Sequence, residues 1–214
     1  MSLRVRFRRW LGVGLRRLRR YVNDVETIGP LDPPAHRFYY FGDGAGLMAP
    51  QGVLLNEHSI SIGEGTLVGP GVSVSAGYSP GQTLPRDPVV DIGCRCVIGR
   101  YSDIVGHERI VVGDDVQTGP GVYITDQNHG YEDVDQPIGT QAPHNKPVEI
   151  GAGSWIGAHA VILPGTRLGE HTVVAAGAVV RGEFPARVVL AGVPARVVRR
   201  WDSALGWTTV REPS

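Results

Sequence analysis

The sequence has only two cysteines and no long apolar run, and each shortage removes a class of protein. Cys94 and Cys96 lie two positions apart with no matching pair elsewhere, which fits neither a zinc site nor a disulfide framework. No apolar run approaches the ~20 residues that span a bilayer. The longest one near the N-terminus, residues 11–15, ends at Arg16 and is too short for the apolar region of a signal peptide. We therefore expect a protein of the reducing cytoplasm.

Glycine, in contrast, is abundant. The chain of 214 residues is 42% apolar, which argues against a disordered protein. Its 30 glycines are about double the usual proportion of roughly 7%. So much glycine in an ordered chain indicates many tight turns or a repeat.

An apolar residue recurs at every sixth position through most of the chain, and glycine often follows it. At one of these positions the residue is threonine instead. We call these residues the anchors. A second series of small or β-branched residues, among them Cys96, follows four positions after the anchors. The anchors are Ile62, Val68, Val74, Ile92, Ile98, Ile104, Val112, Thr118, Ile124, Ile150, Ile156, Ile162, Leu168, Val174 and Val180.

A period of six fits neither the 3.6-residue turn of a helix nor the two-residue alternation of an isolated strand. It is typical of a short strand followed by a corner, with three such sides making a coil of about 18 residues. The anchors and Cys96 would point inward as core, and the glycines would allow the backbone conformations of the corners. The pattern predicts an all-β solenoid over residues 50–195, followed by a short tail at 196–214.

Three segments interrupt the repeat: residues 77–90, 106–111 and 126–149. In a stack of coils an insertion must project outward as a loop. Loops on a rigid scaffold are where binding and catalytic residues are often found. The longest interruption opens with the letters DQNHGYEDV, which place one histidine among carboxylates and amides.

From this motif onward the sequence resembles the hexapeptide-repeat acyltransferases. The run from DQNHGYEDV through KPVEIGAGSWIGAHAVILPG to LAGVPARVVRR is similar to the branch of galactoside and maltose acetyltransferases, over roughly residues 60–200. The resemblance implies a left-handed parallel β-helix, although most parallel crossovers are right-handed. It also implies a homotrimer with active sites between subunits, and the loop 126–149 as a protruding active-site loop.

The implied reaction is transfer of an acyl group, most often acetyl, from acyl-CoA to a hydroxyl of a saccharide or glycoconjugate. His129 matches the family's general base, which takes the hydroxyl proton while the oxygen attacks the thioester directly. An imidazole suits this role because its ordinary pKa of about 6.5 leaves it largely unprotonated near neutral pH. Asp126 and Glu132 are the candidates to fix its tautomer. On spacing alone, His129 could instead cap a turn.

The resemblance further implies a coenzyme A site on the C-terminal coils. Small residues would let the pantetheine arm approach backbone amides, an aromatic would line the thioester, and arginines would bind phosphates. If no cofactor binds there, the aromatic could instead lie at a subunit contact, and the arginines could belong to an ordinary solvated terminal strand. The matching residues are Ala158, Ala176 and Gly177 for the arm, Trp155 for the thioester, Arg196 and Arg199 for the phosphates, and Arg181 in place of a family lysine.

The residues expected to contact the acceptor differ from those of the family. Tyr101 stands where the sugar enzymes have an asparagine that contacts the acceptor, with Asp103 beside it, so the acceptor need not be a galactoside or maltose. Tyr131 and His144 in the long loop are the other predicted acceptor contacts. No histidines have the spacing of the zinc ligands in β-helical carbonic anhydrases, so we expect no catalytic metal. An amino-sugar N-acyltransferase and a non-catalytic scaffold remain the alternative functions.

The N-terminal segment 1–28 has a different character. Residues 1–20 contain eight arginines and no acid, whereas the rest of the chain carries a net charge of −8. On a helical wheel the apolar residues share one face and most arginines take the other, which predicts a basic amphipathic helix. Through residues 1–25 this helix could contact the inner face of an anionic membrane, or it could cap the first coil or pack between subunits. No recognition motif accompanies the charge, so nucleic-acid binding is not expected.

Overall fold

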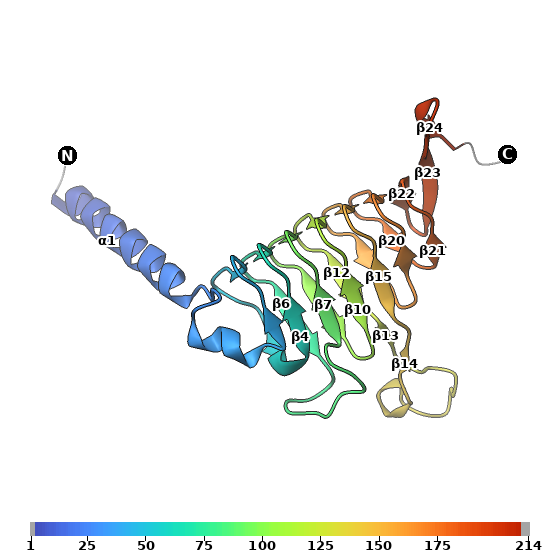
Figure 1. Ribbon diagram of the computed structural model, residues 1–214. Coiled ribbons are helices and arrows are strands. Elements are labelled where there is room, and N and C mark those ends of the chain that lie inside the picture. The colour runs from blue at the N-terminus through green and yellow to red at the C-terminus, as the bar shows by residue number, and fades with distance from the viewer. Residues whose placement is uncertain (1–2, 211–214) are drawn as a thin grey trace.

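The computed structural model describes residues 3–210, apart from the side chains of residues 3–7 and 9. Within this range short strands stack into three main sheets, I, II and III, which form the three sides of a coiled chain (Figure 1). Each turn of the coil contributes a strand to sheet I, then to sheet II, then to sheet III. The strands run parallel except at the C-terminal edge of sheet II, so the coil is a parallel β-helix.

The strands are short, as a six-residue repeat requires. Sheet I contains β1 (Tyr40–Phe41), β4 (Ile60–Ile62), β7 (Val90–Ile92), β10 (Ile110–Val112), β15 (Val148–Ile150), β18 (Arg167–Leu168) and β21 (Glu183–Phe184). Sheet II contains β2 (Gly46–Leu47), β5 (Leu67–Val68), β8 (Val97–Ile98), β11 (Gln117–Thr118), β16 (Trp155–Ile156), β19 (Val173–Val174), β22 (Val188–Gly192), β23 (Ala195–Asp202) and β24 (Gly206–Thr209). Sheet III contains β3 (Leu54–Leu55), β6 (Ser73–Ala76), β9 (Asp103–Gly106), β12 (Tyr123–Thr125), β17 (Val161–Ile162) and β20 (Val179–Val180).

The anchors fill the interior of the coil and stack from turn to turn. In sheet I, Ile62 pairs with Ile92, Ile92 with Val112, and Val112 with Ile150. Every anchor exposes 7% or less of its surface. Cys96 is buried among them, and burial raises the pKa of its thiol. The structure therefore confirms that the six-residue pattern marks the core.

The coil begins earlier than the periodicity indicated, at Tyr40 instead of residue 50. In the first turn Phe41 and Leu47 keep the six-residue spacing, but the next strand begins at Leu54, seven positions later. One extra residue thus hid this turn from the sequence pattern. At the other end, residues 195–209 form strands where we expected a tail, because β23 folds back antiparallel on β22 and β24 on β23.

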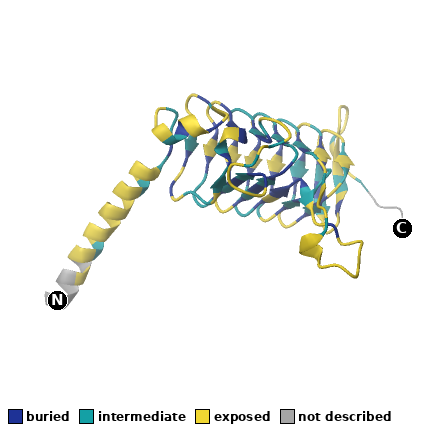
Figure 2. Ribbon diagram, turned by 90° about the horizontal axis from the view of Figure 1, so that it is seen from below, coloured by how far each residue is buried: buried dark blue, intermediate teal, exposed yellow. Residues whose placement is uncertain are grey.

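The N-terminal helix α1 (Leu3–Glu26) is present as predicted, and it points away from the coil (Figures 1 and 2). Its C-terminal end is attached where the side-chain amide of Gln51 donates to the carbonyl of Glu26, at 2.7 Å. The open end of the coil is covered instead by the segment after the helix, which includes the 3₁₀ helix Pro33–Arg37. Its buried residues are Ile28, Ala35 and Phe38. No helix within residues 3–210 is long and apolar enough to cross a membrane.

All three interruptions leave the coil at one corner, between sheet III and sheet I (Figure 1). They follow β6, β9 and β12 respectively. A further 3₁₀ turn, Glu57–Ser59, occupies the same corner in the first coil. The longest interruption folds as an antiparallel hairpin of β13 (Gln127–Asn128) and β14 (His144–Asn145), with a 3₁₀ turn at Ile138–Thr140, and the chain rejoins the coil at Val148. We call this corner the insertion corner and residues 126–147 the hairpin.

The inward direction of the anchors is testable on a single strand. Ile92 is 1% exposed, whereas its neighbour Asp91 points outward. Replacing Ile92 by alanine should lower the free energy of unfolding by about 2–5 kcal/mol, because it leaves a cavity that the coil cannot close. Asp91→Ala should change it by less than about 0.5 kcal/mol. Urea titration followed by circular dichroism measures both, and equal losses would contradict the assignment of faces.

Candidate active site

The base of the hairpin is fixed by a buried carboxylate. Asp126 has no exposed surface, and the backbone amides of His107, Glu108 and Arg109 donate to its two oxygens at 2.7–3.0 Å. These amides belong to the short interruption in the preceding coil. A carboxylate that accepts several N–H groups is well compensated for its burial. Asp126 therefore ties the two interruptions together.

The first interruption joins the same cluster through Tyr78. Its ring lies against the ring of His107, with centroids 4.0 Å apart, and its hydroxyl donates to the side-chain oxygen of Asn145 at 3.2 Å. His107 is buried, and its Nδ1 lies 3.6 Å from the nearer oxygen of Asp126, beyond a hydrogen bond. Residues from three successive coils thus hold the hairpin at its root. In the sequence these interruptions are separated by 15 and 14 residues, and nothing in the pattern shows that they touch.

The hairpin is also closed at its base and fastened to the coil that follows. The amide of Lys146 donates to the carbonyl of Asp126 at 2.7 Å, and the amide of Gly165 donates to the carbonyl of Lys146 at 3.1 Å. Beyond the strands, the side chain of Gln141 bridges the exposed tip by donating to the carbonyl of Asp133 at 2.8 Å. The hairpin is therefore an ordered projection with a fixed root.

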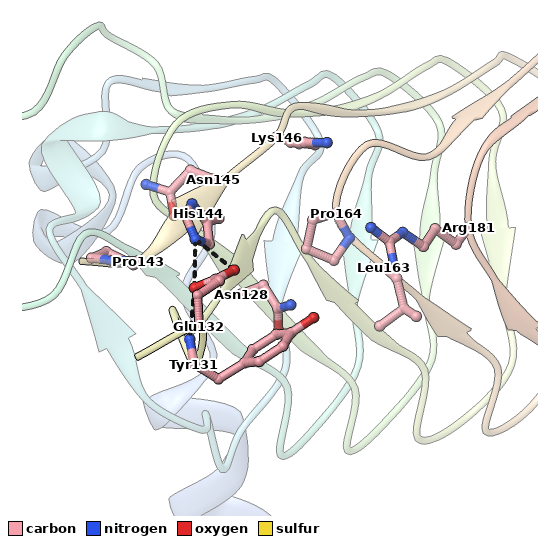
Figure 3. A pocket seen from close by; sticks show the side chains of 10 residues that line it. All are labelled: Asn128, Tyr131, Glu132, Pro143, His144, Asn145, Lys146, Leu163, Pro164 and Arg181. Carbon is pink, nitrogen blue, oxygen red and sulfur yellow. Dashed lines mark hydrogen bonds and ion pairs between the residues drawn. The ribbon is translucent and has the colours of Figure 1, made fainter. Parts of the chain in front are cut away.

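A pocket of about 580 Å³ lies between the hairpin and the corners of the next two coils (Figure 3). The coils contribute Leu163, Pro164 and Arg181, and the remaining lining comes from the hairpin. Such a mixture of a few apolar surfaces and several polar groups is typical of a small-molecule site. The polar side chains that line it are Asn128, Tyr131, Glu132, His144, Asn145, Lys146 and Arg181.

The charges in this pocket are partly paired. The amide of Tyr131 donates to the carboxylate of Glu132 at 2.9 Å, and His144 Nε2 lies 3.2 Å from the same carboxylate. The Tyr131 amide first, and then the Glu132 amide and His144, hold the pKa of Glu132 below its usual value. Lys146 and Arg181 form no ion pair with a carboxylate among residues 3–210. The pocket thus presents one engaged anion and two uncompensated cations.

His129 lies directly after β13, with an exposed side chain that does not line this pocket. Neither predicted tautomer partner reaches it. The carboxylate of Asp126 is turned toward the amides of residues 107–109, and that of Glu132 toward His144. Within the described residues of one chain, His129 therefore has no hydrogen-bond partner for its ring.

The predicted donor residues lie mostly elsewhere on the coil. Trp155 is 56% exposed on the outer face of sheet II, in a row in which it pairs with Val173, Val173 with Val189, and Val189 with Arg199. Trp155 and Arg199 are thus three strand spacings apart, roughly 14 Å. Arg196 and Arg199 donate to the carbonyls of Ala195 and Trp207, and no carboxylate in the described chain pairs with either.

The corner between sheets II and III carries the other predicted residues. Gly177 and Tyr101 occupy equivalent positions there, with φ angles of +70° and +57°, and the Tyr101 ring covers Gly71. Ala158 and Ala176 precede equivalent corner positions, and Asp103 begins the strand β9. Sheet III separates this corner from the insertion corner. Of the predicted donor and acceptor residues, the pocket brings together Tyr131, His144 and Arg181.

Several pocket residues had no sequence signal. Asn128 and Asn145 looked like ordinary polar loop residues, and the pairing of β13 with β14, which sets Asn128 opposite His144, brings both to the pocket. Lys146 is the only lysine in the chain, a rarity that could have drawn attention to it. Among the residues that the structure describes, no group of three histidine, cysteine or acidic side chains has the geometry of a metal site.

Comparison with known proteins agrees with this architecture. Residues 147–182 match the model of the bacterial transferase hexapeptide (six repeats) family. The putative lipopolysaccharide biosynthesis O-acetyl transferase WbbJ of Escherichia coli is 31% identical over 69% of this chain and 74% of its own length. Galactoside O-acetyltransferase of Escherichia coli is 32% identical over 68% of this chain and 66% of its own length.

A solved structure has the same fold at lower identity. AntD, an N-acyltransferase from Bacillus cereus in complex with dTDP and 3-hydroxybutyryl-CoA, superposes with a TM-score of 0.65 at 20% identity, over 77% of this chain and 84% of its own. The likeness to hexapeptide-repeat structures confirms the left-handed parallel β-helix. With the repeat, the hairpin and these relatives in agreement, the chain belongs to the hexapeptide-repeat acyltransferases, in the branch of the sugar O-acetyltransferases.

Proposed function

We propose that this enzyme transfers an acetyl group from acetyl-CoA to a hydroxyl of a saccharide or glycoconjugate, with His129 as the general base. The observation that carries the proposal is the hairpin, which presents His129 on a fixed root beside a polar pocket. Its relatives support the reaction type, since they are named O-acetyltransferases.

The chemistry follows from the groups on the hairpin. The His129 imidazole accepts the proton of the acceptor hydroxyl as that oxygen attacks the thioester carbonyl carbon. The carbon–sulfur bond then breaks, and coenzyme A leaves as its thiolate, which takes up the proton held by the His129 imidazolium. The side chains of Tyr131, Glu132 and His144 are placed to exchange hydrogen bonds with sugar hydroxyls. The Tyr131 amide and His144 hold the pKa of Glu132 below its usual value, so this carboxylate serves as a hydrogen-bond acceptor at neutral pH.

We also propose that the active unit is a homotrimer in which two half-sites from neighbouring subunits meet. One half is the hairpin with Arg181, and the other is the outer face of sheet II with the corner between sheets II and III, which carries Trp155 and Gly177. The exposure of His129 and Trp155 supports this arrangement. Within the described chain the His129 ring has no hydrogen-bond partner, and no side chain covers the exposed part of the Trp155 ring. A neighbour's Tyr101 and Asp103 would then reach the acceptor.

The donor half would hold coenzyme A along sheet II. In this proposal Trp155 lines the thioester, the small residues at Ala158, Ala176 and Gly177 admit the pantetheine arm, and the arginines of β23 bind phosphate. Arginine suits phosphate because its planar guanidinium donates two parallel hydrogen bonds. Arg196 and Arg199 are available for this, since no described carboxylate pairs with them.

We place the reaction in the cytoplasm, at the inner face of the membrane. Both cysteines are free thiols, as expected for a reducing compartment. The arginine-rich N-terminal segment supports contact with a negatively charged surface.

Removal of the base tests the mechanism. His129→Ala should lower kcat/KM by about 10²–10⁴-fold, because the hydroxyl loses its proton acceptor. The matched control is His36→Ala, an exposed histidine on the 3₁₀ helix at the far end of the coil, which should leave the rate unchanged. Free thiol released from acetyl-CoA is measured with a panel of sugars, amino sugars and glycoconjugates. A rate that stays the same in His129→Ala removes it from the mechanism, and turnover with amino sugars alone replaces O-acylation by N-acylation.

Asp126 acts in this account as a positioning residue for the hairpin. Asp126→Asn should reduce kcat/KM by at least about tenfold and make the hairpin sensitive to protease, because the amide replaces one acceptor oxygen by an NH₂ group that faces the converging N–H donors. Asp133→Asn, at the exposed tip, is the control and should change neither. Kinetics and limited proteolysis are measured on the same samples. If both variants behave like the wild type, the buried carboxylate does not position the hairpin.

A further inference from the structure

The helix α1 leaves an apolar stripe open to solvent. Of its described side chains on one face, Trp10, Leu11, Leu15, Leu18, Tyr21, Val22 and Val25 are each between 39% and 74% exposed. A soluble protein rarely exposes a contiguous apolar surface of this kind without a partner for it. The stripe therefore marks an interaction surface that the acyl-transfer site does not use.

No other part of the chain within residues 3–210 covers this stripe. The helix extends away from the coil, and the open end of the coil is already covered by Ile28, Ala35 and Phe38 (Figures 1 and 2). The helix ends at Glu26, where the side chain of Gln51 donates to the backbone carbonyl, and the segment that covers the open end of the coil follows. The partner of the stripe must then come from outside the described chain.

The other face of the helix defines the chemistry of that partner. Eight arginines lie in residues 1–20, with no acidic residue among them. None of those whose side chains are described forms an ion pair with a carboxylate of the described chain. The partner has to offer negative charge and an apolar phase side by side. The exposed arginines with described side chains are Arg8, Arg16, Arg17, Arg19 and Arg20.

We propose that α1 is an interfacial helix that binds the surface of an anionic lipid bilayer. Its 24 residues would lie in the plane of the head groups, with the stripe at the edge of the acyl chains and the arginines on the lipid phosphates. Trp10 and Tyr21 border the stripe, and such aromatic side chains are enriched at this depth of a membrane. The inference rests on the helix alone and holds whatever the acceptor of the enzyme is.

Two other binding partners fit the two faces of the helix less well. Packing of stripes between copies of the chain would gather eight arginines from each copy, with no acidic residue in the same segment to neutralise them. A nucleic acid would satisfy the arginines but would leave the apolar stripe in water. A bilayer surface interacts with both faces of the helix at once, through its acyl chains and its phosphates.

Binding of the full-length protein to vesicles tests the proposal without reference to catalysis. Co-sedimentation is measured with phosphatidylcholine vesicles and with vesicles that contain about 30% phosphatidylserine. We expect binding to the anionic vesicles alone, and loss of binding as salt screens the charges. Binding to neither kind of vesicle, or equal binding to both, overturns the proposal.

A pair of matched variants separates the apolar contribution from the charge. Leu18→Glu puts a carboxylate in the stripe, whereas Val13→Glu makes the same change of charge about 140° away around the helix, among the arginines. Leu18→Glu should weaken vesicle binding by about tenfold or more, and Val13→Glu by less than about threefold. Equal losses would mean that charge alone acts, which contradicts an inserted stripe.

Light scattering in the absence of vesicles decides between a bilayer and a second copy. The two variants should have the same mass as the wild type, and both should retain acyl transfer to a soluble acceptor. A lower mass for Leu18→Glu alone would assign the stripe to contacts between subunits and overturn the proposal. Failure of the wild type to bind anionic vesicles, with acyl transfer intact, would overturn the membrane contact and leave the proposed acyl transfer untouched. Loss of transfer with vesicle binding intact would do the reverse.

Discussion

Close packing of the anchors at the centre of the coil is the constraint on which the rest of this structure depends. Residues such as Ile92, Ile98 and Ile104 fill the interior of each turn, and backbone hydrogen bonds join each turn to the next. A coil built in this way has no room inside for a ligand. Anything that the protein binds must be held on an outer face, at a corner, or in a segment that leaves the coil.

The insertion corner shows how the chain uses that limitation. Three interruptions leave at the same corner in successive turns, so they lie against one another and not in isolation. Asp126 fixes the position of these interruptions relative to one another, because its buried carboxylate accepts hydrogen bonds from the backbone amides of the preceding turn. A hairpin with such a root can carry His129 and the pocket residues on an otherwise featureless coil. The same logic explains why the face of sheet II, which has no insertion, can offer only a row of side chains such as Trp155 and Arg199.

The sequence predicted the fold well because the repeat is read directly from the anchors. It missed the first turn, where the spacing between Leu47 and Leu54 is one residue too long, and the last strands, whose antiparallel pairing has no six-residue period. The position of His129 on a projecting loop also followed from the sequence. Its surroundings did not, because the direction of the Asp126 carboxylate depends on the amides of residues 107–109, which only the stacking of coils brings near. The resemblance predicted sites between subunits, but the sequence did not show that Gly177 and Arg181, which are close in the chain, lie at opposite ends of one short strand of sheet III.

The central claim of this account is that the two halves belong to different subunits. It is tested most directly by mixing subunits that carry His129→Ala with subunits that carry Trp155→Ala, each with its own affinity tag, and assaying purified mixed oligomers. If neighbouring subunits share each site, the mixed trimers should have about a third of the wild-type rate, because one of the three sites in each mixed trimer then receives two intact halves. Mixed oligomers no more active than either parent would show that a single chain contains the whole site, and would contradict the account.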